Sequence, residues 1–475
     1  MNRKELEKLE KKILKKDKNS FEYLNKKQAS AAFAFAEEYK TFLNNAKTER
    51  EAVNEIVKMA KANGFIDIDM ITDKTPLKEK KYYRVFKGKS VGVAVLGQDS
   101  IENGLNIIAS HIDSPRLDLK QNPLYEDLDL ALMKTHYYGG IKKYQWLNIP
   151  LALHGIIIKS NGEKLNITIG EDLKDPIFAV SDLLPHLSGK LQQNKKLSEV
   201  FDGEKLNILC GSIPLGDEKT KNRYKLAVLK LLYDKYGIIE EDFVSAEIEA
   251  VPASNARDIG FDRSMIGAYG QDDRICAFTE LKALLALKNP GRTALALFFD
   301  KEEIGSVGNT SAKSKITEDF ILELLFLNRE KPDFRTMRKS INSSICLSAD
   351  VNAAMDPDYK EVHEKMNAAR LGRGICITKY TGSRGKTGAS DANAEFLGKI
   401  IELFNNNKIV WQTGELGKTD EGGGGTLGKF LAESGMDVLD CGPALLSMHS
   451  PLEISSKADI HMTYSGYKSF FESNG

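Results

Sequence analysis

Cysteine is scarce in this sequence, and it contains no long apolar run. Its 475 residues include five cysteines, none of them in a C-x-x-C pair. Scattered cysteines in apolar or mixed runs are typical of buried, reduced thiols and favour a reducing compartment. No uninterrupted apolar stretch approaches the roughly 18 residues of a membrane span. Residues 1–21 are charged throughout and lack the apolar core of a signal peptide. We therefore expect a cytoplasmic protein without a membrane partner.

An excess of charge of either sign is also missing. Lysine and arginine together number 67, as do aspartate and glutamate, so the formal net charge is +0. This balance argues against a nucleic-acid partner, because proteins that bind nucleic acids carry basic surfaces. The hydrophobic content of 41% and the charged content of 28% are those of a globular protein. The length allows two or three domains of about 150 residues each.

The pattern of predicted helices and strands changes twice along the chain. Apolar residues at helical spacing fill residues 30–65, and strand-like runs follow up to Pro115. Residues 116–252 then show short alternating apolar runs, with a strong hairpin signal at Asn161-Gly162. Beyond them, helices alternate with buried apolar strands again.

This order predicts an α/β protein with a doubly wound, mixed sheet. Residues 1–115 and 253–475 would together form that α/β domain. Residues 116–252 would be a β-rich domain inserted into it.

Histidine and acidic side chains follow several of the predicted strands. They are His111 and Asp113 after 105–110, Asp300, Glu302 and Glu303 after 294–299, Asp350 after 343–349 and His449 after 436–448, with Asp272 and Asp273 just before a helix. Open α/β sheets bind ligands beyond the carboxyl ends of their strands, so these residues should meet at one edge. The mixture of ligands suits zinc, manganese or cobalt. Each motif alone is more often structural, and only their joint placement predicts a metal site.

Five motifs carry a family resemblance. They are "ASHIDSPRLDLK", "YGQDDRICAF", "DKEEIGSVGNTSA", "SADVNAAMDPDY" and "LLSMHSP". In this order they closely resemble the M18 family of metalloaminopeptidases, the aspartyl aminopeptidase and aminopeptidase I group. The resemblance implies two divalent metal ions, of which zinc is the first expectation, on an α/β peptidase domain. It also implies an inserted dimerisation domain and assembly of dimers into a dodecamer.

The resemblance also implies a role for individual residues. The metal ligands would be His111, Asp272 bridging both ions, Glu303 on one ion, Asp350 on the other, and His449. Glu302 would be the general base, and Asp113 would orient His111. His186, in the inserted segment, would reach the active site of a neighbouring subunit, where it would bind metal or contact substrate.

Two further motifs concern substrate binding. The stretch from Gly423 to Lys429 nearly matches a phosphate-binding loop, but Phe430 stands where Ser or Thr is needed for magnesium. We expect instead a glycine-rich loop, including Gly423 and Gly424, whose backbone approaches the substrate. A second loop carries three basic residues, Lys379, Arg384 and Lys386. These are either solvated or select a carboxylate-bearing substrate.

Together these observations predict a two-metal aminopeptidase that removes single residues from peptide N-termini. One alternative is a metal-dependent amidohydrolase that deacylates N-acyl amino acids, with the same ions and the same base. A non-enzymatic alternative is a shell-forming scaffold or cargo protein.

Overall fold

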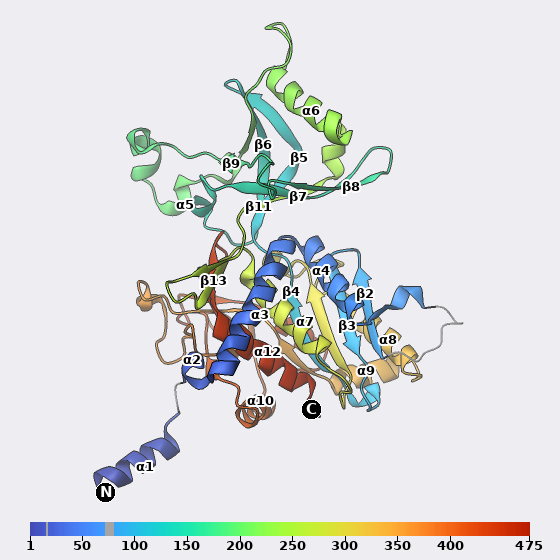
Figure 1. The fold of residues 1–475 in the computed structure, drawn as a ribbon, viewed down its shortest axis with the longest axis vertical. Coiled ribbons are helices and arrows are strands. Elements are labelled where there is room, and N and C mark those ends of the chain that lie inside the picture. The colour runs from blue at the N-terminus through green and yellow to red at the C-terminus, as the bar shows by residue number, and fades with distance from the viewer. Residues whose placement is uncertain (16–17, 72–79) are drawn as a thin grey trace.

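The computed structural model describes residues 1–15, 18–71 and 80–475, and Figure 1 shows a larger body below a smaller one. Within the described residues, thirteen strands of the larger body form one sheet, whose main path is β1-β2-β3-β14-β4-β15-β22-β23-β13-β12. The strands are β1 (Ile66–Asp67), β2 (Lys81–Phe86), β3 (Ser90–Val95), β4 (Asn106–His111), β12 (Arg257–Ile259), β13 (Met265–Ala268), β14 (Ala294–Phe299), β15 (Ile345–Ser348), β16 (Asn352–Ala353), β17 (Ile375–Thr378), β20 (Trp411–Thr413), β22 (Asp437–Leu446) and β23 (Glu453–Ser456). Strands β14, β4, β15 and β22 are parallel, whereas β3 and β14 are antiparallel, so the sheet is mixed.

Helices cover both faces of this sheet (Figure 1). One apolar core contains residues of α3 (Lys26–Asn45), α4 (Glu49–Ala62), α7 (Gln271–Leu285), α10 (Ala394–Asn406) and α12 (Lys457–Phe471). A second contains residues of α8 (Ile316–Leu327), α9 (Phe334–Asn342) and α11 (Gly428–Glu433). Strand β14 serves both cores, because Phe298 packs in the first and Phe299 in the second. The predicted α/β class with a doubly wound, mixed sheet is confirmed.

The smaller body carries a second sheet, whose strands all lie within residues 116–252, and we call these residues the inserted segment. Seven of its strands form a sheet in the order β8-β7-β11-β5-β6-β10-β9. They are β5 (Arg116–Asp127), β6 (Leu130–Tyr138), β7 (Leu151–Ile158), β8 (Lys164–Ile169), β9 (Ala179–Val180), β10 (Ile208–Gly211) and β11 (Glu247–Pro252), with helices α5 (Leu197–Val200) and α6 (Arg223–Tyr236). The predicted hairpin around Gly162 is the β7–β8 pair.

The N-terminal helices divide more finely than the sequence pattern predicted. Helices α1 (Arg3–Ile13) and α2 (Ser20–Tyr23) precede α3, and α1 projects away from the body in Figure 1. The predicted helical run over 30–65 is two helices, because Thr48 caps α4 in a capping box with Glu51. None of the described helices is long and apolar enough to cross a membrane.

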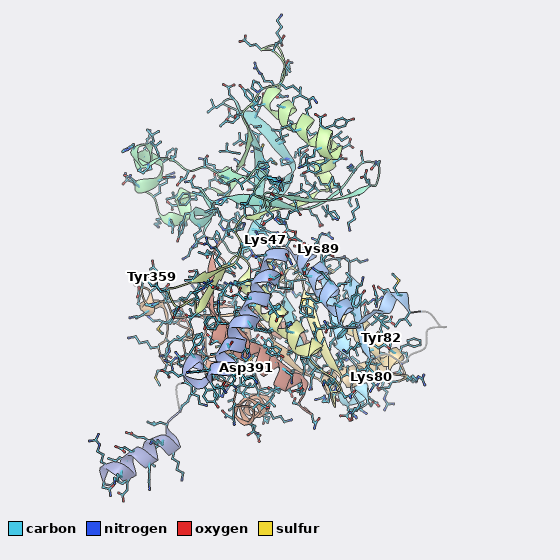
Figure 2. All side chains as sticks on the ribbon, in the orientation of Figure 1. Lys47, Lys80, Tyr82, Lys89, Tyr359 and Asp391 are labelled. Atoms are coloured by element: carbon cyan, nitrogen blue, oxygen red, sulfur yellow. The ribbon has the colours of Figure 1, made fainter. Side chains whose placement is uncertain are left out.

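Ion pairs join the two bodies at the start of the inserted segment. Arg116 on β5 lies 2.8 Å from Asp118, 3.1 Å from Glu249 and 3.6 Å from Glu49 at the start of α4. Lys89 lies 3.1 Å from Glu49 and 3.2 Å from Glu247, and Figure 2 labels this lysine where the bodies meet. The inserted segment is therefore held by buried charges as well as by its two connecting strands.

Candidate metal centre

Four parallel strands and one helix bring the predicted metal-site residues to one edge of the large sheet. His111 ends β4, and Glu303 lies in the short 3-10 helix η8 (Glu302–Ile304) that follows β14. Asp350 follows β15, and His449 follows β22. Asp272 occupies the first turn of α7, where its backbone is not helical. The carboxyl ends of parallel strands meet at the same edge, which places all five side chains together.

Asp272 lies between the two histidines. His111 Nε2 is 3.1 Å from Asp272 Oδ1, and His449 Nε2 is 3.2 Å from Asp272 Oδ2. Asp350 Oδ1 lies 3.9 Å from His111 Nε2, and Glu303 Oε2 lies 3.4 Å from His449 Nε2. Two groups of ligand atoms result, one from His111, Asp272 and Asp350 and the other from Asp272, Glu303 and His449. Ligand atoms around a tetrahedral zinc ion lie about 3.3 Å apart. The spacings of 3.1, 3.2 and 3.4 Å match this value, and the spacing between Asp350 and His111 is longer, at 3.9 Å.

The buried polar atoms of the site also fit bound cations. Asp272 Oδ1 and Glu303 Oε1 are buried and make no hydrogen bond. Burial alone would lower the pKa of His449, but the charges of Glu303 and Asp272 outweigh it and raise that pKa to about 11. A cluster of buried carboxylates that draws protons onto its histidines needs positive charge, and metal ions supply it.

Asp113 connects His111 to the turn that carries Glu302. Its carboxylate accepts hydrogen bonds from the backbone amides of Glu302, at 3.1 Å, and Glu303, at 3.2 Å. His111 Nδ1 lies 3.1 Å from the backbone oxygen of Asp113 and 3.4 Å from its Oδ1. Burial raises the pKa of Glu302 to about 7, His111 opposes this rise, and Asp113 adds to it. Asp300, left unassigned by its sequence, bonds to Lys301 and Thr310 instead.

Three residues around the site were missed by sequence reasoning. Glu453 accepts hydrogen bonds from the backbone amides of Asp272, at 3.1 Å, and His449, at 2.8 Å. Tyr138 donates its hydroxyl hydrogen to Asp113 Oδ2 at 2.8 Å. His449 Nδ1 lies 2.9 Å from the backbone oxygen of Gly140. Only the position of Glu453, four residues after His449, could have drawn attention to it.

A cavity of about 950 Å³ opens beside the metal-site residues. Its far wall includes the three-stranded sheet of β18 (Tyr380–Ser383), β19 (Thr387–Asp391) and β21 (Gly423–Gly424). The predicted Gly423 and Gly424 thus line the cavity. The basic side chains that line it are Lys418 and Lys429.

The other predicted substrate-site residues lie elsewhere. Lys379, Arg384 and Lys386 are not among the residues that line the cavity, although neighbouring Tyr380 and Gly385 are. Arg384 and Lys386 are exposed, and Lys379 lies over the ring of Tyr380. His186, in the 3-10 helix η4 (Pro185–Leu187), is exposed on the inserted segment and does not line the cavity of its own chain.

Histidines and carboxylates gathered at the edge of an α/β sheet, beside a cavity, are typical of metal-dependent enzymes. Residues 42–471 match the family described as aminopeptidase I zinc metalloprotease (M18). The chain is 50% identical over 460 residues to a probable M18 family aminopeptidase 1 of Clostridium acetobutylicum, covering 96% of this chain and 98% of the relative. A crystal structure of an M18 family aminopeptidase from Thermotoga maritima is similar with a TM-score of 0.92 and 47% identity, over 97% of this chain and all (100%) of the other.

The chain belongs to the M18 family. It is a metalloaminopeptidase, and its cofactor is zinc. The alternative prediction of a non-enzymatic scaffold or cargo protein is therefore wrong. A more distant structure, the mApe1 dodecamer of S. cerevisiae, shares the fold with a TM-score of 0.73 at 19% identity and covers 92% of this chain and 96% of the other.

Proposed function

We propose that this aminopeptidase removes the N-terminal residue of peptides with two zinc ions and Glu302 as general base. One ion would be held by His111, Asp272 and Asp350, and the other by Asp272, Glu303 and His449. The observation that carries the proposal is the position of Asp272, whose two oxygens each face a different histidine, at 3.1 and 3.2 Å. A single carboxylate in that position can bridge two ions.

Bound zinc would polarise the scissile carbonyl and activate a water molecule for attack on it. Glu302 lines the cavity and accepts the proton of that water, which it then passes to the leaving amine. Asp113 holds Glu302 in place through its backbone amide and orients His111. The backbone of Gly423 and Gly424 lies along the extended part of the substrate.

The charges of the cavity favour a free amino terminus over an acylated one. Asp391, Glu415 and Asp440 line the cavity in addition to the carboxylates assigned to zinc and to the base. Carboxylates attract an ammonium group, whereas a deacylase must hold the carboxylate of its substrate. Lys418 and Lys429 are the lysines of the cavity that could select an acidic side chain. This is one of the two roles that the sequence left open for Lys379, Arg384 and Lys386, the other being a solvated loop.

The decisive assay compares aminoacyl chromogenic substrates with their N-acetylated forms, each with and without a chelator. We expect chelator-sensitive turnover of the free-amine substrates alone, and turnover of only the acetylated set would refute an aminopeptidase.

Glu302→Gln should abolish turnover while two zinc ions per chain remain bound. Glu303→Gln is the matched comparison, because it should lose zinc as well. Zinc loss from Glu302→Gln instead would show that the two roles are exchanged.

We further propose that the inserted segment dimerises and that the dimers assemble into a dodecamer. Leucines are exposed on one arm of this segment, namely Leu183, Leu184, Leu187, Leu191 and Leu197. A second copy of the chain is the occupant that would bury them. The dodecameric relative supports this choice, and His186, among these leucines, would then reach a neighbouring cavity.

Light scattering tests the assembly. Leu187→Glu should give a smaller particle than the unmodified protein, because it places a charge in the proposed interface. Leu6→Glu changes an exposed leucine of α1 and should leave the particle size unchanged. Equal sizes for all three proteins would refute this interface. A cytoplasmic location remains a prediction from the sequence.

A further inference from the structure

The chain passes the metal centre immediately after it leaves strand β6 of the inserted segment. Tyr138 is the last residue of β6 and pairs with Arg116, the first residue of β5. Gly139 and Gly140 follow, and Gly139 has a φ of +75°. A β-carbon on Gly139 would lie 3.2 Å from Pro115 and 3.4 Å from Glu303, so this turn fits closely against the turn that carries the metal-site glutamates.

Tyr138 contacts Asp113, which in turn contacts the metal-site histidine His111. Its hydroxyl group is 2.8 Å from Asp113 Oδ2, and its side chain is buried. The same carboxylate accepts the backbone amides of Glu302 and Glu303. Without the hydroxyl group, the carboxylate loses a donor in a place that water does not reach, and its orientation is less defined.

Gly140 contacts the other metal-site histidine, His449, directly. Its backbone oxygen can only accept a hydrogen bond, so His449 Nδ1, 2.9 Å away, must carry the proton. The lone pair of His449 is thereby placed on Nε2, which faces Asp272 and Glu303. The backbone oxygen of Asp113 has the same effect on His111. Both imidazoles are thus held in the tautomer that a metal ion requires.

The inserted segment fixes this stretch of chain. The guanidinium carbon of Arg116 lies 3.9 Å from the centre of the Tyr138 ring. Arg116 is itself held by Asp118 and Glu249 of the inserted segment and by Glu49 of the larger body. A displacement of the inserted segment would therefore move Tyr138 and Gly140 together.

We propose that Tyr138, Gly139 and Gly140 are positioning residues that set both metal-site histidines, so that zinc binding depends on the placement of the inserted segment. This role is separate from subunit association, and it rests on the two-zinc site proposed above. It assigns to the inserted segment a part in the chemistry of its own chain.

The first test compares Tyr138→Phe with Tyr137→Phe. Tyr137 is adjacent but exposed and lies on the opposite face of β6, so its variant controls for the loss of a hydroxyl group. Zinc is titrated into each metal-free protein by calorimetry, and the melting temperature is measured in chelator. We expect Tyr138→Phe to bind at least one zinc equivalent about ten-fold more weakly, because such supporting contacts carry about 10–100-fold in metal affinity.

Two further readouts separate positioning from folding. Zinc affinity is compared at a temperature well below both metal-free melting temperatures, where both variants are folded, because Tyr138→Phe loses a buried hydrogen bond and should melt lower than Tyr137→Phe. With zinc in excess, kcat should fall in Tyr138→Phe while KM is unchanged, since Tyr138 does not line the cavity. Zinc affinities that are equal for Tyr138→Phe, Tyr137→Phe and the unmodified protein would overturn the proposal.

A backbone variant provides an independent test should Tyr138→Phe not fold. Gly139→Ala adds a methyl group against Pro115 and Glu303, and should weaken zinc at the His449 side. Gly162→Ala is its control, because Gly162 has a φ of +85° in the same segment with nothing within 4 Å. Equal zinc affinities of these two variants would count against the proposal. An unmodified protein that binds no zinc would instead refute the proposed function.

Discussion

Arg116 offers a quantitative test of how the inserted segment is held. It is 5% exposed and faces three carboxylates at 2.8, 3.1 and 3.6 Å. Replacing it by methionine keeps most of the volume but leaves buried acids without their cation. Removing one partner of a buried ion pair costs about 3–5 kcal/mol. Because Lys89 remains 3.1 Å from Glu49, we expect the lower end of that range.

The pH dependence of this loss has a definite sign. Arg116 and Lys89 hold the pKa of Glu49 well below its usual range, against the effect of burial. In Arg116→Met the folded-state pKa of Glu49 rises. A carboxylate with a raised folded-state pKa is least favourable above that pKa and recovers as it is protonated. The stability deficit of the variant should therefore be larger at pH 8 than at pH 5.

Urea unfolding at both pH values measures this deficit, with Arg263→Met as the control. Arg263 also pairs with an aspartate, Asp258, but its side chain is 72% exposed, and Lys40 and Lys457 remain to pair with Asp258. Its replacement should leave the unfolding midpoint unchanged. Our reasoning would be refuted by a deficit in Arg116→Met that matches the control, or that does not shrink on acidification.

Three other predictions concern stability. Removing zinc with a chelator should lower the melting temperature, and returning it at 100 times its dissociation constant should restore about 2.7 kcal/mol per site, as calorimetry can measure. Burial raises the pKa of Asp440 to about 6, against the hydrogen bond that its carboxylate accepts from Thr426. The contribution of Asp440 to stability is therefore present below its unfolded-state pKa and is lost as the pH rises to about 6, and the loss amounts to about 3 kcal/mol. Urea unfolding as a function of pH measures this loss in the unmodified protein. The loss should be absent from Asp440→Asn, which has no carboxyl group to titrate. Thr48→Ala should cost about 1 kcal/mol through loss of the α4 cap, whereas Thr48→Ser should not.

Much of the fold could be predicted from local patterns. The alternation of Ala294 to Phe299 between two apolar cores explains why a continuous apolar run was a correct sign of a central strand. The turn residues Asn161-Gly162 were a correct sign of the β7–β8 hairpin. The break between α3 and α4 was missed, because a capping threonine within a helical pattern is a weak signal.

Some residues of the candidate site could be predicted from the sequence, and others could not. His111, Asp272, Glu303, Asp350 and His449 could be selected because each lies at the end of a strand or the start of a helix. The basic loop from Lys379 to Lys386 was selected by composition, and composition does not say which side chains turn toward a cavity. Lys418 and Lys429 do so here.

The sequence by itself determined which elements form and which charged residues stand at their ends, since both follow from neighbours along the chain. The tertiary structure alone decided that Asp272 lies between two histidines and that Glu453 accepts the backbone amides of Asp272 and His449. It also brought Tyr138 to Asp113 and Gly140 to His449, across 25 and 309 residues of sequence. Such contacts depend on the position of the inserted segment relative to the large sheet, and no local sequence pattern encodes that position.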